Sequence, residues 1–342
     1  MRLDPLLDLF RGRAITIPPL DGALRPNTAL DAAPVFDGLA APDNLSWLDG
    51  RLVCSSGATV LALQAGQRLP LAEFPAEVTA LSVSPAGALV VATDDGRLSE
   101  GGQAVPLPGG VACITALAHG PDGTLWLANG SRHHPASGWV ADLMERGASG
   151  AVWRRRPGAG WEQVAGGLAW PNGLLPGTAG CIVSEAWRHR LIRLESGRLD
   201  PVLLHLPGYP ARLCPAAEGG AWLAVFAPRT RLIEFVLQET RYRHDMMAEV
   251  PRDYWIAPAL ASGRSFLEPL QCGGIRTMGV HKAWSPSRSY GLVVRLGPDM
   301  APVASLHSRA NGQRHGVTSV HETDGRLYIA AKGGDAVLEV TA

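Results

Sequence analysis

The chain has 342 residues, 46% of them hydrophobic, and its 31 basic residues balance 31 acidic ones. A net charge of zero provides no electrostatic footprint for nucleic acid or an anionic membrane, so neither is expected as a partner. Glycine (40 residues) and proline (27) are abundant, which is typical of short strands joined by tight turns within one soluble domain.

The N-terminal residues 1–11 mix charged side chains with apolar ones, so neither a secretory signal nor a membrane span is predicted. The five cysteines are odd in number and lack C-x-x-C spacing. We expect reduced, buried thiols in a cytoplasmic protein. Lys282 and Lys332 are the only lysines among the basic residues, a bias that we attribute to genomic base composition.

A glycine in a turn leads directly into a short apolar strand six times along the chain. The six units begin at Gly50, Gly87, Gly123, Gly180, Gly220 and Gly325. A repeat of about 40 residues is typical of the blades of a β-propeller. The pattern predicts an all-β fold, a six-bladed β-propeller that takes residues 1–342 as a single domain. The long last interval leaves a seventh blade open.

Two insertions, 131–147 and 238–285, interrupt the repeat. The first contains the helical phrase Trp139–Met144 and is expected between blades three and four, and the second favours a helix over 238–250 that ends at Pro251. Insertions of this kind commonly leave one rim of a propeller and cover its axis. We therefore expect a helical insertion near the axial rim, acting as a lid or as a wall of an axial pocket.

Residues 150–226 carry a series of short motifs in a fixed order. They are GAVWR at 150–154, GGLAWPNGL at 166–174, VSEA at 183–186 and LPGYP at 206–210. The series resembles the strictosidine synthase-like family, six-bladed propellers related to the regucalcin/gluconolactonase and paraoxonase groups, and the resemblance extends over residues 35–342. It implies a site on the propeller axis, built from loop residues of several blades.

In the metal-dependent relatives, the resemblance implies a calcium ion on this axis, held by several oxygen ligands. Asp43 matches the acidic position and Asn172 the second one, but Ala211 and Arg212 stand where the relatives have Asp-Asn. A guanidinium beside the ion position would repel calcium. We therefore expect no cofactor and a degenerate metal site formed by Asp43 and Asn172. Arg212 is expected either to pair with Asp43 or to turn outward into solvent.

The glutamate that strictosidine synthase uses for proton transfer is replaced here by Thr318, whose hydroxyl has no suitable pKa, so this particular activity is not expected. Thr318, Asn172 and Trp170 are instead expected to contact a small-molecule substrate. Trp170 directly precedes Pro171 and would line the mouth of the pocket.

His315 and His281 are the predicted acid–base residues, because histidine titrates near neutral pH and each has a glycine neighbour that would let the backbone approach a ligand. Together with Arg212 and Asp43 they form the expected catalytic set. Glu185 also interrupts an apolar strand, but we expect it to be structural and paired with Arg190 or Arg193.

Three functions remain open. We favour a hydrolase of a lactone or ester, in which Arg212 replaces the ion as oxyanion donor and a histidine is the base. The first alternative is a metal-free condensation, cyclisation or isomerisation enzyme of secondary metabolism. The second is a propeller that binds a ligand without catalysis. The sequence indicates no substrate identity and no oligomeric state.

Overall fold

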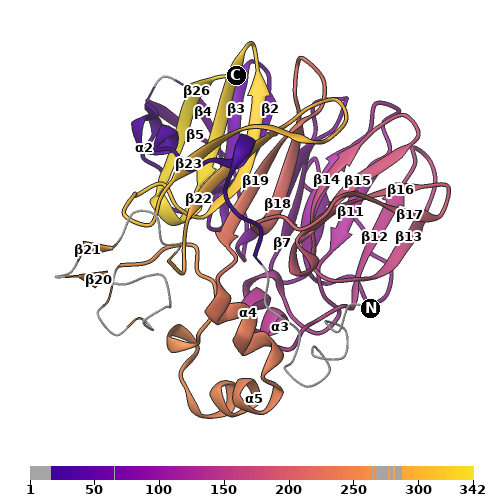
Figure 1. Ribbon diagram of the computed structural model, residues 1–342. Helices are drawn as coiled ribbons and strands as arrows, with labels where there is room; N and C mark the ends of the chain where they lie inside the picture. The colour runs from indigo at the N-terminus through magenta and orange to yellow at the C-terminus, as the bar shows by residue number, and fades with distance from the viewer. Residues whose placement is uncertain are drawn as a thin grey trace.

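The computed structural model describes residues 17–64, 66–263, 265, 268, 276–277, 280–281 and 287–342. Six four-stranded antiparallel sheets form a six-bladed β-propeller (Figure 1), which confirms the predicted fold and blade count. The innermost strands of successive blades contact one another around a closed ring, because the first blade also contacts the last.

The first four blades each take four consecutive strands. Blade one consists of β2 (Pro42–Leu48), β3 (Arg51–Ser56), β4 (Thr59–Gln64) and β5 (Gln67–Glu73). Blade two consists of β6 (Val78–Val83), β7 (Leu89–Thr93), β8 (Leu98–Glu100) and β9 (Gln103–Ala104). Blade three consists of β10 (Ile114–His119), β11 (Leu125–Asn129), β12 (Gly150–Arg155) and β13 (Trp161–Leu168). Blade four consists of β14 (Pro171–Pro176), β15 (Gly180–Glu185), β16 (Arg190–Glu195) and β17 (Arg198–Leu203).

The last two blades are assembled from strands that are distant in sequence. Blade five consists of β18 (Gly208–Pro215), β19 (Ala221–Pro228), β22 (Gly291–Leu296) and β23 (Pro302–Ser308). Blade six consists of β24 (Val317–Thr323), β25 (Arg326–Ala331), β26 (Ala336–Thr341) and β1 (Val35–Asp37). Val35 pairs with Leu338, so a strand from the beginning of the chain completes the sheet formed by its end. This pairing closes the ring.

Five of the repeated glycines precede the second strand of a blade and Gly180 is the first residue of one, which explains why their number equals the number of blades. Gly50 (φ +75°) and Gly87 (φ +80°) adopt the left-handed conformation that favours glycine in the turn after the innermost strand. The long interval before Gly325 arises from an insertion within blade five, and a seventh blade is absent from the described residues.

The two insertions lie within blades. The first connects β11 to β12 of blade three, which corrects the expected position between blades three and four; it contains η2 (Ala136–Gly138) and α3 (Trp139–Met144). The second connects β19 to β22 and contains α4 (Arg231–Gln238), α5 (Thr240–Glu249), η4 (Arg252–Tyr254) and the pair β20 (Arg276–Thr277) and β21 (Val280–His281). The predicted helix is α5. Figure 1 shows α3, α4 and α5 gathered on one side of the propeller.

Helix α4 was not predicted, and it precedes the predicted helix; the Thr230 side chain caps it by accepting a hydrogen bond from the backbone N–H of Ile233. The remaining helices are single turns or little more: η1 (Gly22–Leu24), α2 (Ala29–Ala32), η3 (Ala186–Arg188) and η5 (Lys332–Gly334). Among the described residues, no helix combines the length and the apolar character needed to cross a membrane.

Apolar side chains between neighbouring blades form the core, and the described cysteines belong to it. Cys54, Cys113, Cys181 and Cys214 are free, buried thiols, as predicted. Burial raises the pKa of the Cys113 thiol to about 12. The fifth cysteine, Cys272, lies outside the described residues.

Candidate functional site

Every innermost strand breaks its pairing register near its first residues. In four blades the break is a bulge of one residue, which the partner strand leaves unpaired; these residues are Thr79, Thr115, Asn172 and Thr318. A bulge redirects a residue out of the ladder and is frequent beside binding sites. All four residues line one cavity, together with Asp43 from β2 and Arg212 from β18.

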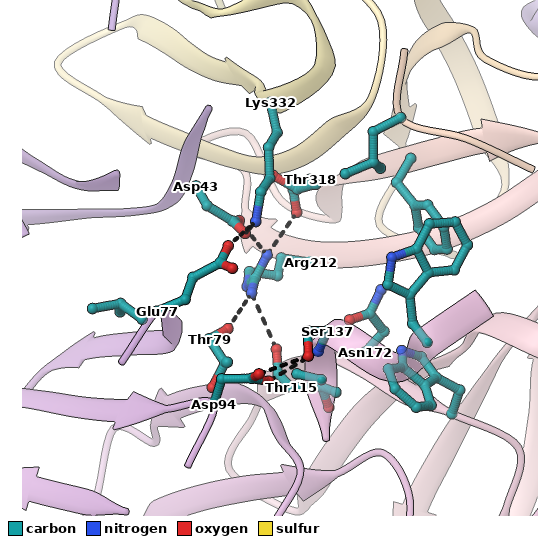
Figure 2. Close-up of a pocket in the computed structure, with 16 residues that line it drawn as sticks. Asp43, Glu77, Thr79, Asp94, Thr115, Ser137, Asn172, Arg212, Thr318 and Lys332 are labelled. Atoms are coloured by element: carbon teal, nitrogen blue, oxygen red, sulfur yellow. Dashed lines mark hydrogen bonds and ion pairs between the residues drawn. The ribbon is translucent and has the colours of Figure 1, made fainter. Parts of the chain in front are cut away.

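This axial cavity has a volume of about 300 Å³. Figure 2 shows charged and hydroxyl side chains on one side of it and large aromatic rings on the other. We define the polar floor as Asp43, Glu77, Thr79, Thr115, Arg212, Thr318 and Lys332. We define the aromatic wall as Trp139, Trp170 and Phe226.

Arg212 lies at the centre of the polar floor (Figure 2). Its Nη1 donates to Asp43 Oδ1 at 2.7 Å and to the Thr318 carbonyl at 3.3 Å. Its Nη2 donates to the carbonyl oxygens of Thr79 at 2.7 Å and Thr115 at 3.2 Å. The guanidinium thus joins four blades, and Arg212 pairs with Asp43 instead of turning outward. Its buried Nε has no acceptor among the described residues.

Lys332 and Glu77 complete the polar floor, and the sequence analysis did not select either. Lys332 Nζ donates to Asp43 Oδ2 at 3.2 Å and to Glu77 Oε1 at 2.7 Å. The rarity of lysine in this chain could have drawn attention to Lys332, but we interpreted it as an effect of genomic base composition. Glu77 directly precedes β6 and Lys332 directly follows β25, so only the closed ring brings them together.

The charges of the polar floor stabilise one another. Burial alone would raise the pKa of Asp43, but the neighbouring cations Arg212 and Lys332 outweigh burial and bring it below its usual value of 3.8. Burial likewise opposes the charge of Lys332, but Asp43 and Glu77 raise its pKa above 10.5. Asp43 and Lys332 are therefore both ionised at neutral pH.

The aromatic wall combines a blade residue with the first insertion. Trp170 adopts a left-handed backbone conformation (φ +57°), is buried, and stacks on Trp187 with ring centroids 5.1 Å apart. Trp139 of α3 meets Phe226 edge to face at 5.4 Å. These contacts fix the rings in place. As expected, the first insertion supplies part of the pocket wall, and the second supplies Leu260.

A small polar network connects the insertions to the cavity. Ser137 donates its backbone N–H and its hydroxyl to the two oxygens of Asp94, at 2.9 and 2.7 Å. Arg252 of the second insertion donates to the Ser137 carbonyl at 2.7 Å. Asp94 and Ser137 also line the cavity, so both insertions are anchored at its rim.

The predicted histidines are not part of this cavity in the described residues. His315 is buried, its Nδ1 lies 2.8 Å from Ser289 Oγ, and its Nε2 lies 2.8 Å from the Arg309 carbonyl oxygen. The ring packs against Tyr290 of blade five. The structure therefore places His315 between the last two blades and not on the axial cavity. The backbone of His281 belongs to β21, and its side chain lies outside the described residues.

Glu185 has the structural role expected from the sequence. Its side chain is fully buried, and its carboxylate accepts hydrogen bonds from Arg190, from Arg188 and from the backbone N–H of Ala169. Arg190 is thus the predicted partner, Arg193 is not a partner among the described residues, and Arg188 is an additional one. Asn172 Nδ2 lies 3.4 Å from the Pro210 carbonyl oxygen, and its side chain lines the axial cavity.

The polar floor is a poor match for the calcium ion that the resemblance implies. Such an ion requires six to eight oxygen ligands. Here the Asp43 carboxylate is already shared by two cations, and the guanidinium takes the carbonyl oxygens of three blades. No group of three or more His, Cys, Asp or Glu side chains is arranged to hold a metal within the part of the chain that the structure describes.

The sequence matches no protein-family model and no curated protein. Solved structures, in contrast, share the architecture over almost the whole chain. A gluconolactonase from Xanthomonas campestris is 15% identical, with a TM-score of 0.54 over 92% of this chain and 93% of that one. Regucalcin from Agrobacterium tumefaciens, described as a calcium-binding protein, is 13% identical, with a TM-score of 0.56 over 90% and 92%. A streptogramin B lyase is 12% identical, with a TM-score of 0.51 over 90% and 96%.

At these identities the likeness concerns the fold alone. The gluconolactonase and regucalcin structures are six-bladed propellers of the architecture described above. The narrower resemblance to strictosidine synthase-like proteins stays a prediction. What the comparisons establish is that this chain has the same six-bladed propeller fold as gluconolactonase and regucalcin.

Proposed function

We propose that this protein is a small-molecule hydrolase that opens a lactone or an ester in its axial cavity without a calcium ion. The fold shared with a gluconolactonase is compatible with this chemistry, and the polar floor supplies ionised groups for it. The observation that carries the proposal is the position of Arg212. Its guanidinium lies on the axis, bound to Asp43 and to carbonyl oxygens of three other blades.

In this proposal Arg212 organises the site more than it contacts the substrate. Its four terminal N–H groups are directed to protein oxygens, and its Nε–H is buried, so Arg212 has little donor capacity for a ligand. The guanidinium holds Asp43 ionised, and Asp43 in turn holds Lys332. A fixed cation thereby replaces the organising role that a metal ion has in other hydrolases.

The aromatic wall suggests the substrate class. A volume of about 300 Å³ suits a molecule of one or two rings. Trp139, Trp170 and Phe226 offer flat apolar surfaces on one side, and the polar floor offers charges on the other. The best match is a ring-bearing ester or lactone, with its ring on the wall and its carbonyl group toward the floor.

Isomerisation or cyclisation by acid–base groups is the second candidate. The observation that favours it is the close pair of a carboxylate and an ammonium, Glu77 and Lys332, which could move a proton without an attacking water. A substrate converted to an isomer, with no incorporation of oxygen from labelled water, would favour this candidate over hydrolysis.

The test is a hydrolysis assay of the purified chain on a panel of aryl esters and aryl-substituted lactones. Each substrate is measured in EDTA, and again after dialysis into calcium. We expect turnover of at least one substrate at the same rate in both conditions. Absence of turnover across the panel would reject the hydrolase, and turnover that requires calcium would reject the role of Arg212.

A further inference from the structure

We propose that Lys332 and Glu77 are the reacting pair of the axial cavity: Lys332 binds the carbonyl oxygen of the substrate, and Glu77 activates the attacking water. The inference rests on the proposed hydrolase function and assigns its catalytic residues. It replaces His315, which the structure places away from the cavity, and it gives Arg212 and Asp43 a positioning role.

Of the two cations on the polar floor, Lys332 has an N–H donor that the described residues leave unused. An ammonium group carries three N–H donors. Two of them are directed to Asp43 and Glu77, and no described residue accepts the third. Arg212, the other cation on the polar floor, has committed all its terminal donors to protein oxygens. A substrate oxygen in the cavity therefore finds a charged donor at Lys332 Nζ.

Among the carboxylates that line the cavity, Glu77 has an oxygen that accepts no hydrogen bond from the described residues. Asp43 uses both oxygens, because Oδ1 accepts from Arg212 and from the Asn44 N–H while Oδ2 accepts from Lys332. Asp94 likewise accepts two hydrogen bonds from Ser137. Glu77 Oε1 accepts from Lys332, whereas Oε2 accepts no hydrogen bond from the described residues.

Glu77 and Asp43 also differ in how far their side chains are exposed to water. The Glu77 side chain is 44% exposed, and the Asp43 side chain is only 10% exposed. Figure 2 shows Glu77 reaching from the side of blade two toward Lys332, at the edge of the cavity. Glu77 can therefore hold a water molecule that Asp43 cannot reach.

The two groups complete a balanced hydrolysis. Glu77 accepts a proton from water as the water oxygen forms a bond to the carbonyl carbon, and the carbonyl oxygen becomes an oxyanion stabilised by Lys332 Nζ–H. The tetrahedral intermediate collapses, the bond to the leaving oxygen breaks, and the protonated Glu77 returns its proton to that oxygen. The products are a carboxylate with its released proton and an alcohol, joined in one molecule when the substrate is a lactone.

The first test compares two variants of the full chain with a matched control. Glu77→Gln should reduce kcat by roughly 10²–10⁴-fold, the usual contribution of a positioned base. Lys332→Met should reduce kcat by roughly 10²–10³-fold, the usual contribution of one oxyanion donor. Lys332→Arg should recover part of the loss. Glu73→Gln changes an exposed glutamate of β5 and should leave kcat unchanged.

The second test measures binding of an aryl phosphonate monoester, a stable tetrahedral anion, by calorimetry. Lys332→Met should weaken its binding at least tenfold because it removes the oxyanion donor. Glu77→Gln should maintain or tighten binding because it removes a nearby negative charge. A purely structural role would weaken binding in both variants, and that result would overturn the assignment.

The outcomes separate this inference from the proposed function. If the wild-type protein hydrolyses esters and both variants retain its kcat within threefold, the reacting pair is wrong and the hydrolase stands. If the wild-type protein hydrolyses no ester but binds the phosphonate through Lys332, the hydrolase is wrong and the oxyanion position is supported. Phosphonate binding that is indifferent to Lys332, in a protein without hydrolysis, overturns both.

Discussion

Two buried carboxylates in this propeller have similar partners and different surroundings. Asp43 is bound by Arg212 and Lys332 on the axis, and Glu185 is bound by Arg188 and Arg190 between strands of blade four. Judged by their ion pairs alone, the two carboxylates cannot be distinguished. Asp43, however, borders the axial cavity of about 300 Å³, whereas Glu185 is fully buried and does not line that cavity.

The difference shows that charge pairing alone does not identify a functional site. Both oxygens of Glu185 accept hydrogen bonds from groups of blade four and of the connection that leads into it, so the cluster serves packing. The Asp43 cluster includes residues from five blades and leaves donor and acceptor capacity at Lys332 and Glu77. Access to a cavity together with unused hydrogen-bonding capacity distinguishes the candidate site.

Replacing Asp43 should have the largest effect. Asp43→Asn leaves Arg212 and Lys332 without their shared counter-charge, which should cost roughly 3–5 kcal/mol of unfolding free energy. Because Lys332 also loses its anchor, kcat on the best ester should fall at least 100-fold, by analogy with the loss of one oxyanion donor. Urea unfolding and steady-state kinetics measure the two effects. Wild-type kinetics in this variant would show that Asp43 does not contribute to catalysis.

Replacing Glu185 should reduce stability while leaving catalysis intact. Glu185→Gln removes the charge that binds two arginines, but both are partly exposed to water, so the cost should be about 1–3 kcal/mol. The kcat of the folded protein should match the wild type. A loss of kcat comparable to that of Asp43→Asn would contradict the distinction drawn here between the two carboxylates.

Installing the Asp-Asn pair that the family resemblance implies at positions 211 and 212 should create a calcium site. The double substitution Ala211→Asp and Arg212→Asn removes the axial cation and introduces two side chains with oxygen donors in β18. Calcium at 100 times its Kd should then stabilise the variant by about 2.7 kcal/mol. Thermal unfolding with and without calcium measures the shift, with magnesium as a control. The wild-type protein should show no shift, and an equal shift in both proteins would contradict the role of Arg212.

Changing the aromatic wall should affect binding more than chemistry. Trp139→Ala removes a ring that faces the cavity from α3, so KM for an aryl ester should rise about tenfold, or about 1.4 kcal/mol, with little change in kcat. An alkyl ester of similar size should lose less affinity. Equal losses for aryl and alkyl esters would argue against ring recognition.

The smallest expected effect is a change in the stability contribution of Asp43 at acidic pH. Because the folded-state pKa of Asp43 lies below 3.8, its contribution to stability is present above that pH and is lost as pH falls through the folded value. The stability difference between wild type and Asp43→Asn should therefore shrink as pH decreases below 3.8. Urea unfolding at several acidic pH values measures it. A difference that stays constant would indicate that the charge of Asp43 contributes nothing.

The fold could be predicted because its signal is local. Each repeated glycine lies at the turn that leads into the second strand of a blade. Because the turn and its strand adjoin each other in sequence, the six units reveal six blades. The helical nature of the insertions was similarly evident from short segments. The position of Asp43 and Arg212 on the axis followed from motif resemblance, and their pairing required only opposite charges at neighbouring positions.

The reacting pair could not be predicted because its members meet only after the ring closes. Glu77 and Lys332 are separated by almost the whole propeller in sequence, and neither lies in a recognisable motif. His315 was misplaced for the opposite reason. Its glycine neighbour suggested an open loop, but Ser289 and the carbonyl of nearby Arg309 bind the ring within the packing of blades five and six.

The pairing of Val35 with Leu338 also determines when this protein can finish folding. During synthesis, β1 leaves the ribosome long before β26 exists, so blade six cannot be assembled until β26 has been translated. Such long-range strand pairing is slow. Nascent chains stalled before β26 should carry an open sheet edge, and Lys332 and Thr318, although already translated, should lie in a blade that cannot yet close. The ring that holds the polar floor together would thus close only after β26 has been made.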